Sequence, residues 1–362
     1  MQSRAAVSPA VAAFLLTFAA DYGIIGAEKQ QKGWFFMENG QIWRDTDGNI
    51  LHAHGGHILR ADGYWYWYGE DRTGGNYVSV YRSRNLHSWE FRNHVLTVDS
   101  PAAYARVRCA DLRLCREIGE EEYRHRTGAE RAVNTAFERD GKKYAKVNIE
   151  RPKVLFCPQT GRYVLWAHYE NGADYSAAAA MVASCDTPDG DFVYHGSFNP
   201  YGEMSRDCTL FADDDGRAYF ISASRENCDL HFYRLTPDFL NVARWVSTAF
   251  QGESREAPAV FKRAGRYYIL SSYCTGWAPN QGQWACADSI DGDWSVPHNF
   301  GDETTYRSQP AFVVERDGAF FYVGDRWMGG GAAYFDSTYV VLPIDFDASG
   351  EPSIAYSDTA AW

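Results

Sequence analysis

The sequence has no excess of positive charge, few cysteines and no hydrophobic run of membrane-spanning length. Its 35 Lys and Arg are outnumbered by 47 Asp and Glu, and the formal net charge is −12. This balance argues against a nucleic-acid partner, because affinity for nucleic acid depends on Lys and Arg that neutralise phosphates. We therefore do not expect nucleic acid to be a partner.

Eight cysteines in 362 residues are too few for a fold that depends on disulfide bonds. Cys274 and Cys286 are the candidate pair, since they would face each other if a hairpin joined them. Cys109 and Cys115, near His125, lack the spacing of a zinc site. We expect no metal-ligating set among these residues.

The N-terminal apolar run extends from Ala10 to Ala20 and is too short to cross a bilayer as a helix. Arg4 precedes this run and small residues follow it, which is the pattern of a secretory signal peptide. We expect residues 1–27 to be a signal peptide or a disordered N-terminus, and the protein to be secreted or periplasmic.

The main feature that is present is one unit repeated five times. Each copy starts with a polar residue, continues as a short apolar strand, turns at a glycine and returns as an aromatic-rich strand. The turn glycines are Gly63, Gly161, Gly216, Gly265 and Gly318. The polar residues are His54, Glu150, Asp207, Glu256 and Gln309. Four of these lie nine residues before their glycine and Glu150 lies eleven before, so the copies share one register.

A four-stranded propeller blade needs about 40 to 50 residues. The last four turn glycines are 55, 49 and 53 residues apart, and the first gap of 98 residues holds additional sequence. We therefore predict an all-β, five-bladed β-propeller in one domain, residues 34–362. A helical or irregular insertion at about 99–145 is expected either to border the substrate cleft or to be a disordered surface loop. We expect a strand near Ile42 and Trp43 to complete the last blade, and Asp213–Gly216 to be a hairpin turn instead of a calcium loop.

Strands that start near one axis would bring the five polar residues into one small volume. Crowded carboxylates repel one another, so at least one should hold a proton near neutral pH. A glycosidase needs such a group to protonate the leaving oxygen. The 12 Trp and 24 Tyr have two interpretations, packing between blades and stacking on sugar rings.

Several motifs resemble family 43 glycoside hydrolases and, more narrowly, the exo-β-1,3-galactanase-like branch of that family. The motifs are residues 53–56, 66–70, 149–154, 205–216, 255–261, 274–280 and 308–309. The likeness extends from about residue 42 to 345, apart from the insertion. It implies a five-bladed propeller with inverting chemistry and an oligo- or polysaccharide substrate.

The resemblance also implies catalytic roles. Glu256 matches the general acid, and Asp207 matches the carboxylate that adjusts the pKa of the acid and orients it. The usual first-blade base is absent, since Ala53–Gly55 contains no carboxylate. Gln309 matches the glutamine that positions or activates water in this branch, either as an imidic acid or as an amide. Glu150 is expected to bind sugar hydroxyls and to share in base function.

A further set of residues is expected to bind the terminal sugar. The set is Glu70, Tyr175, Asn227, Thr275, Gly276, Trp277 and His54. No cofactor is expected to be required, although a structural cation in the central channel would lie near His54 and Asp207. Two positions depart from the branch: His57 replaces an expected glycine, and Pro310 follows Gln309.

Three functions fit these residues. The first is an inverting exo-glycosidase that releases terminal galactose from β-1,3-galactan, as in arabinogalactan-type glycans. The second is an α-L-arabinofuranosidase or β-D-galactofuranosidase on the same fold. The third is a non-catalytic sugar-binding propeller, against which the joint presence of Glu256, Asp207 and Gln309 counts, because a binder needs no proton donor.

Overall fold

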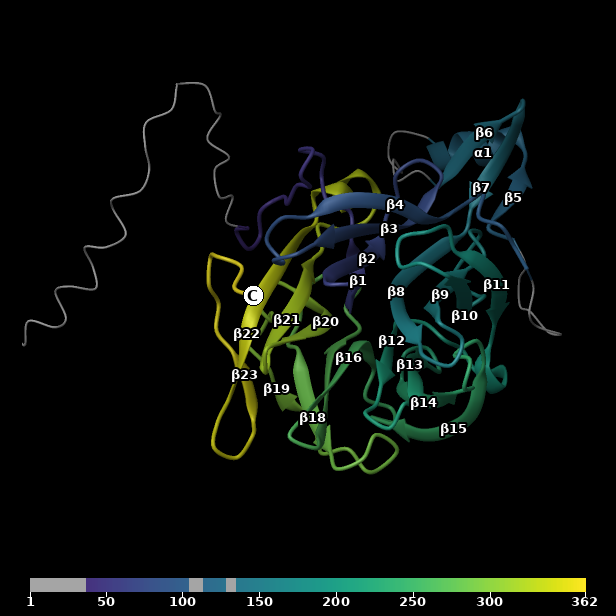
Figure 1. Ribbon diagram of the computed structural model, residues 1–362. Coiled ribbons are helices and arrows are strands. Elements are labelled where there is room, and N and C mark those ends of the chain that lie inside the picture. Colours follow the sequence, from purple (N-terminus) through teal and green to yellow (C-terminus); the bar gives the residue numbers. More distant parts are fainter. Residues whose placement is uncertain (1–36, 104–112, 128–134) are drawn as a thin grey trace, which may run out of the picture. The chain divides into compact units, whose positions relative to one another are not determined.

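The computed structural model describes residues 37–103, 113–127 and 135–362, and their strands form six antiparallel sheets (Figure 1). All of them fall within the unit Phe36–Trp362. The segment 1–27, for which a signal peptide or disorder is expected, lies outside the described residues, as does Cys109. No helix within the described ranges is long and apolar enough to cross a membrane.

Five of the sheets have four strands, each strand pairing with the next along the chain. The first sheet contains β1 (His54–Ala61), β2 (Tyr64–Glu70), β3 (Asn76–Ser83) and β4 (Glu90–Thr97). The second contains β8 (Asn148–Cys157), β9 (Arg162–Glu170), β10 (Ala179–Cys185) and β11 (Val193–Phe198). The third contains β12 (Cys208–Ala212), β13 (Ala218–Ser224), β14 (Asp229–Leu235) and β15 (Val242–Ala249). The fourth contains β16 (Arg255–Arg263), β17 (Arg266–Tyr273), β18 (Gln283–Ala287) and β19 (His298–Asn299). The fifth contains β20 (Gln309–Arg316), β21 (Ala319–Arg326), β22 (Thr338–Phe346) and β23 (Pro352–Ile354).

The first strands of these five sheets contact one another in a closed cycle. β1 contacts β8, β8 contacts β12, β12 contacts β16, β16 contacts β20, and β20 contacts β1. Five hydrophobic clusters fill the five junctions between neighbouring sheets. Each sheet is therefore buried on both faces, and this explains why its strands are apolar at consecutive positions.

The aromatic run Tyr64–Tyr68 illustrates this packing. Tyr66 and Tyr68 belong to the cluster between the first and second sheets, whereas Trp65 and Trp67 belong to the cluster between the first and fifth. Successive side chains of a strand point to opposite faces, so one short run supplies two interfaces. The packing interpretation of the aromatic content is correct for this run.

The inserted segment differs from its prediction as a helical or irregular region. Its described part forms a three-stranded sheet of β5 (Cys115–Ile118), β6 (Ala136–Arg139) and β7 (Lys142–Lys146), with one helix, α1 (Glu120–Thr127). α1 buries no side chain, but it has acidic residues in its first turn and basic residues in its last turn. These charges complement the helix dipole.

The expectation that a strand near Ile42 and Trp43 completes the last blade is wrong. β23 occupies the fourth position of the fifth sheet. The N-terminal segment contacts β22 of that sheet through one backbone bond, from the Gly40 N–H to the Tyr339 carbonyl at 2.9 Å, and through side chains. The Asn39 amide donates to the Val341 carbonyl at 3.0 Å and accepts from its N–H at 2.8 Å. The ring of Trp43 lies 5.2 Å from that of Tyr339.

Asp213–Gly216 is a hairpin turn, as predicted. The Gly216 N–H donates to the Asp213 carbonyl at 3.0 Å, and the Asp213 side chain accepts from Lys262 and Tyr267. All seven cysteines in the described part of the chain are free, Cys274 and Cys286 included.

Candidate active site

The five polar residues of the repeat lie at corresponding ends of the first strands. His54 and Gln309 begin β1 and β20, Glu150 and Glu256 lie near the starts of β8 and β16, and Asp207 immediately precedes β12. Because these strands contact one another in a cycle, the polar ends converge. This convergence agrees with the spacing argument from the repeats.

Three of these strands bend immediately after the polar residue. The register shifts at this point in β1, β8 and β16, and the next residue has a left-handed backbone. The φ angles are 59° at Gly55, 56° at Arg151 and 53° at Ala257. This conformation costs about 1–2 kcal/mol for a residue with a side chain. Bulges of this kind change the direction of a side chain next to an active site.

A carboxylate from another sheet accepts a hydrogen bond from the backbone N–H at each of these bends. Asp325 accepts from Gly55 at 2.9 Å, and Glu70 accepts from Arg151 at 3.1 Å. Asp207 accepts from Ala257 at 3.1 Å. Each sheet is thus tied to a neighbour at the point where its polar residue is presented.

Glu256 has the properties of a proton donor. Its Oε1 accepts from Gln309 Nε2 at 2.8 Å, and its Oε2 accepts from Asn227 Nδ2 at 3.3 Å. Burial and the negative charge of Asp207 raise the pKa of Glu256 to about 7, against the opposing charge of Arg151. A carboxyl with this pKa holds its proton in much of the population at neutral pH.

Asp207 holds the acid in place. One of its oxygens accepts from the backbone N–H of Ala257, the residue after the acid, and forms an ion pair with Arg151 Nε at 3.2 Å. Arg151 is 5% exposed, and its pKa is raised because the charges of Asp207 and Asp325 outweigh its burial. The pair orients the acid and places a negative charge beside it.

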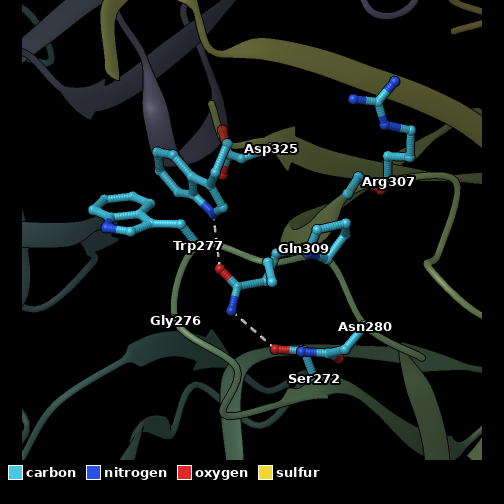
Figure 2. A pocket seen from close by; sticks show the side chains of 11 residues that line it. Ser272, Gly276, Trp277, Asn280, Arg307, Gln309 and Asp325 are labelled. Carbon is cyan, nitrogen blue, oxygen red and sulfur yellow. Dashed lines mark hydrogen bonds between the residues drawn. The ribbon is translucent and has the colours of Figure 1, made fainter. Parts of the chain in front are cut away.

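Gln309 lies against the acid. Its Oε1 accepts from Arg151 and from Trp327 Nε1 at 2.8 Å. Its Nε2 donates to Glu256 and to Ser272 Oγ at 3.0 Å. Figure 2 shows the bonds to Trp327 and Ser272. All hydrogen-bonding positions of the amide are occupied within the protein.

Glu150 belongs to a second charged group. Tyr175 donates to its Oε1 at 2.6 Å and Arg72 at 3.1 Å, while His168 Nδ1 lies 3.3 Å from its Oε2. Burial alone would raise the pKa of Glu150, but hydrogen bonding to His168 and the charge of Arg72 hold it below its usual range.

His168 is the cation of this group. Burial would lower its pKa, but contacts with Glu150 and Glu170 raise it to about 9. Glu150 is therefore ionised at neutral pH, in contrast to Glu256. The two groups meet at Glu70, which accepts from the backbone of Arg151 and from Arg72 at 2.9 Å.

His54 lies behind the site instead of within it. It is 2% exposed, its Nδ1 is 3.0 Å from Asp325 Oδ1, and its ring stacks on Tyr339 at 4.4 Å. In this arrangement it supports the pocket wall and has no face open to a sugar.

A pocket of about 280 Å³ lies on the Gln309 side of the site (Figure 2). Its lining includes Ser272, Gly276, Trp277, Gln309, Asp325 and Trp327. Trp277 is 43% exposed and meets Trp327 edge-on at 5.5 Å, so its indole is available for stacking. Thr275 Oγ1 donates to the Ala278 carbonyl, and Gly276 has a φ of 60°; both shape the loop that carries Trp277.

Two left-handed turns, each of three non-glycine residues, deliver side chains to the acid. Residues 225–227 all have positive φ, and Asn227 contacts Glu256. Residues 305–307 also have positive φ and immediately precede Ser308 and Gln309. Such turns are costly for L-residues, and strain of this kind concentrates at functional sites.

Sequence reasoning assigned no role to Asp325, Trp327, Arg151, Arg72 or His168. A signal for Asp325 was present, because the second strand of a hairpin ends opposite the start of the first, as it does for the predicted Glu70. Glu70 pairs with His54, and Asp325 pairs with Gln309. Arg151 stands inside the Glu-Arg-Pro-Lys motif, but its sequence position does not indicate which groups its guanidinium reaches.

Comparison with known proteins agrees with this geometry. Residues 155–300 match the model of glycosyl hydrolases family 43. An exo-β-1,3-galactanase from Clostridium thermocellum is 40% identical, with a TM-score of 0.73 over 89% of this chain and 65% of its own. An exo-β-1,3-galactanase from Phanerochaete chrysosporium, solved with galactose, is 32% identical, with a TM-score of 0.72 over 89% of this chain and 67% of its own.

A family 43 β-1,3-galactosidase, solved with galactodeoxynojirimycin, is 28% identical, with a TM-score of 0.74 over 90% of this chain and 100% of its own. No curated protein sequence matches the chain. The chain spans less than two thirds of the clostridial enzyme's length. The family match, together with the identity and coverage of the fungal enzyme, shows that the chain belongs to glycoside hydrolase family 43.

Proposed function

We propose that this chain is an inverting, exo-acting glycoside hydrolase that releases terminal galactose from β-1,3-galactan. The observation that carries the proposal is the environment of Glu256, a buried carboxyl whose pKa is raised to about 7 beside Asp207. Protonation of the glycosidic oxygen requires a carboxylic acid of this kind. A sugar-binding protein without catalysis has no need of one.

The choice of sugar is supported by the relatives. The clostridial and fungal proteins are exo-β-1,3-galactanases, and the fungal enzyme with one glutamate replaced was solved with β-1,3-galactotriose.

In the proposed mechanism, Glu256 gives its proton to the leaving oxygen while water attacks the anomeric carbon from the opposite face. Asp207 supports the acid through Ala257 and Arg151. Glu150, which is ionised, would bind sugar hydroxyls or accept the proton of the water. Trp277 and Tyr175, which are exposed, would contact the sugar. Protonation and attack use side chains alone, so the proposal includes no cofactor.

For the structural cation that the sequence left open in the central channel, we propose an internal substitute. Lys153 is fully buried, and its ammonium donates to the carbonyls of Gly55 and Arg151. Its charge lies near Asp207 and Asp325. A lysine ammonium in this position would supply the positive charge that a structural cation would otherwise bring.

We further propose that the five four-stranded sheets are the blades of a five-bladed propeller. The closed cycle of strand contacts and the five intersheet clusters support this architecture. Residues 34–362 would then form one catalytic domain. We also propose export of the protein, on the basis of the apolar N-terminal run.

The test is turnover of β-1,3-galactobiose, aryl α-L-arabinofuranosides and aryl β-D-galactofuranosides, with the first product identified by NMR. Initial release of α-galactose from the galactobiose is the expected result. Faster turnover of a furanoside would show that a furanoside, and not galactan, is the substrate. Sugar binding without turnover of any of these would overturn the assignment as a hydrolase. Glu256→Gln is the control: activity that persists in this variant would come from a contaminant.

A further inference from the structure

The hydrogen-bond partners of Gln309 show which end of its side-chain amide is the oxygen and which is the nitrogen. One end faces Arg151 and Trp327 Nε1, and the other faces Glu256 and Ser272. A guanidinium and an indole N–H donate hydrogen bonds and have no acceptor. The atom between them must therefore be an oxygen that bears no proton, and the nitrogen must face the acid.

This arrangement selects the amide over the imidic-acid tautomer. An imidic acid carries a proton on oxygen, and that proton would point at two donors. Its nitrogen would also carry one hydrogen instead of two, so Glu256 and Ser272 could not both accept from it. As an amide, Gln309 satisfies all four contacts, and buried polar groups are rarely left unpaired.

We propose that Arg151 and Trp327 are positioning residues that hold Gln309 as an amide donor to the acid, so that Gln309 stabilises Glu256 instead of removing a proton from the attacking water. The inference rests on the proposed function for its catalytic meaning, but its structural content does not require turnover. It assigns the water side of the reaction to a group other than Gln309.

The chemical consequence follows from the proton balance of the acid step. The O–H bond of Glu256 breaks, its proton moves to the glycosidic oxygen, and a carboxylate remains. Gln309 Nε2, at 2.8 Å from Oε1, then donates to an anion, and such bonds are about twice as strong as neutral ones. A donor that strengthens as charge develops lowers the barrier.

Other groups also act on the charge of Glu256. Asp207 and Arg151 contribute opposite charges, and Asn227 and Cys274 contribute hydrogen bonds. Arg151 therefore acts on the acid in two ways that both favour its ionised form, by its own charge and by holding Gln309 in place. A variant at Gln309 or Trp327 separates these effects better than a variant at Arg151.

The first test uses the protein without substrate. The side-chain amides of glutamine are labelled with ¹⁵N, and the Gln309 signals are identified by their loss in Gln309→Glu. We expect two N–H signals on one nitrogen that shift with pH near 7, and no such shift in Glu256→Gln. A single N–H signal, or a pair of signals that does not shift as Glu256 titrates, would overturn the proposal. Trp327→Phe removes one donor and should displace these signals; unchanged signals would overturn the positioning role.

The second test is the pH dependence of kcat/KM on β-1,3-galactobiose. In Gln309→Glu a carboxylate faces Glu256, so the alkaline limb should move to higher pH and kcat should fall by at least about tenfold. If Gln309 were the base, the variant would keep or increase its rate with the limb unchanged. Gln283→Glu is the matched control, since Gln283 accepts from Arg255 but donates to Asn299; its limb should stay in place. Lack of turnover on galactobiose would refute the proposed function, and the NMR result would still decide the inference.

Discussion

Removal of the negative charge beside the acid is the most direct perturbation of this site. In Asp207→Asn the amide oxygen can still accept from the Ala257 N–H, which Asp207 holds at 3.1 Å. Arg151, which lies 3.2 Å from Asp207, loses its ionic partner and keeps its charge. Both changes favour the ionised form of Glu256, so its pKa should fall.

The magnitude follows from the pKa of about 7 that Glu256 has with Asp207 in place. Loss of one neighbouring charge moves a carboxyl pKa by about 1 to 2 pH units. The protonated fraction at pH 7 would then fall from about one half to between about 9% and 1%. We expect kcat/KM at pH 7 to drop by about 5- to 50-fold, with much of the loss restored at pH 5.

The assay is the initial rate on β-1,3-galactobiose between pH 4 and 9. The alkaline limb of kcat/KM should move to lower pH in Asp207→Asn. Asp214→Asn is the control, since Asp214 is 86% exposed and pairs with Lys262 in a hairpin turn; its profile should match that of the unchanged protein. An alkaline limb that stays in place or moves upward in Asp207→Asn would refute the proposed coupling.

Three further predictions concern stability and binding. The folded pKa of Glu256 lies above its ordinary value of 4.5, so the native state retains its proton longer and loses stability as pH rises from about 4.5 to 7. Glu256→Gln should remove about 3 kcal/mol of this loss. The free energy of unfolding in denaturant should therefore rise more, relative to the unchanged protein, at pH 8 than at pH 4. An equal rise at the two pH values would contradict the raised pKa. Trp277→Ala removes a side chain that is 43% exposed and should raise KM about tenfold, or about 1.4 kcal/mol, with kcat little changed; a loss confined to kcat would exclude stacking. Ala257→Gly places glycine at a φ of 53° and should stabilise the fold by up to about 1 kcal/mol in urea unfolding, whereas destabilisation would show that the bend carries no strain.

Much of the chain's organisation was visible in its repeats. The spacing of Gly161, Gly216, Gly265 and Gly318 predicted the periodic hairpins, because each sheet needs a similar length and a tight turn. The polar residue at each strand start predicted a convergent site, since the first strands meet in a cycle. The prediction failed where packing decides, as in the segment near Ile42, where β23 occupies the sheet edge.

Roles within the site were harder to predict. His54 has the same register as Glu256 and Gln309, yet it is 2% exposed and stacked on Tyr339. Trp327 and Asp325 stand outside the motifs, and they enter the site only because β21 returns beside β20. Register places a residue at a strand end, but the bend after it and its neighbours decide where the side chain points.

The sequence by itself determined an all-β chain of repeated hairpins with carboxylates at one end, because strand periodicity and turn chemistry are local properties. The resemblance of its motifs to family 43 also pointed to Glu256 as the candidate acid among the three carboxylates of the repeat. Only the tertiary structure decided which carboxyl is protonated. Glu256 and Glu150 are both partly buried glutamates, but Asp207 stands beside one, and Arg72 and His168 beside the other. Asp207 and Arg72 come from sheets next to the glutamate on which they act, whereas His168 faces Glu150 across the β8–β9 hairpin.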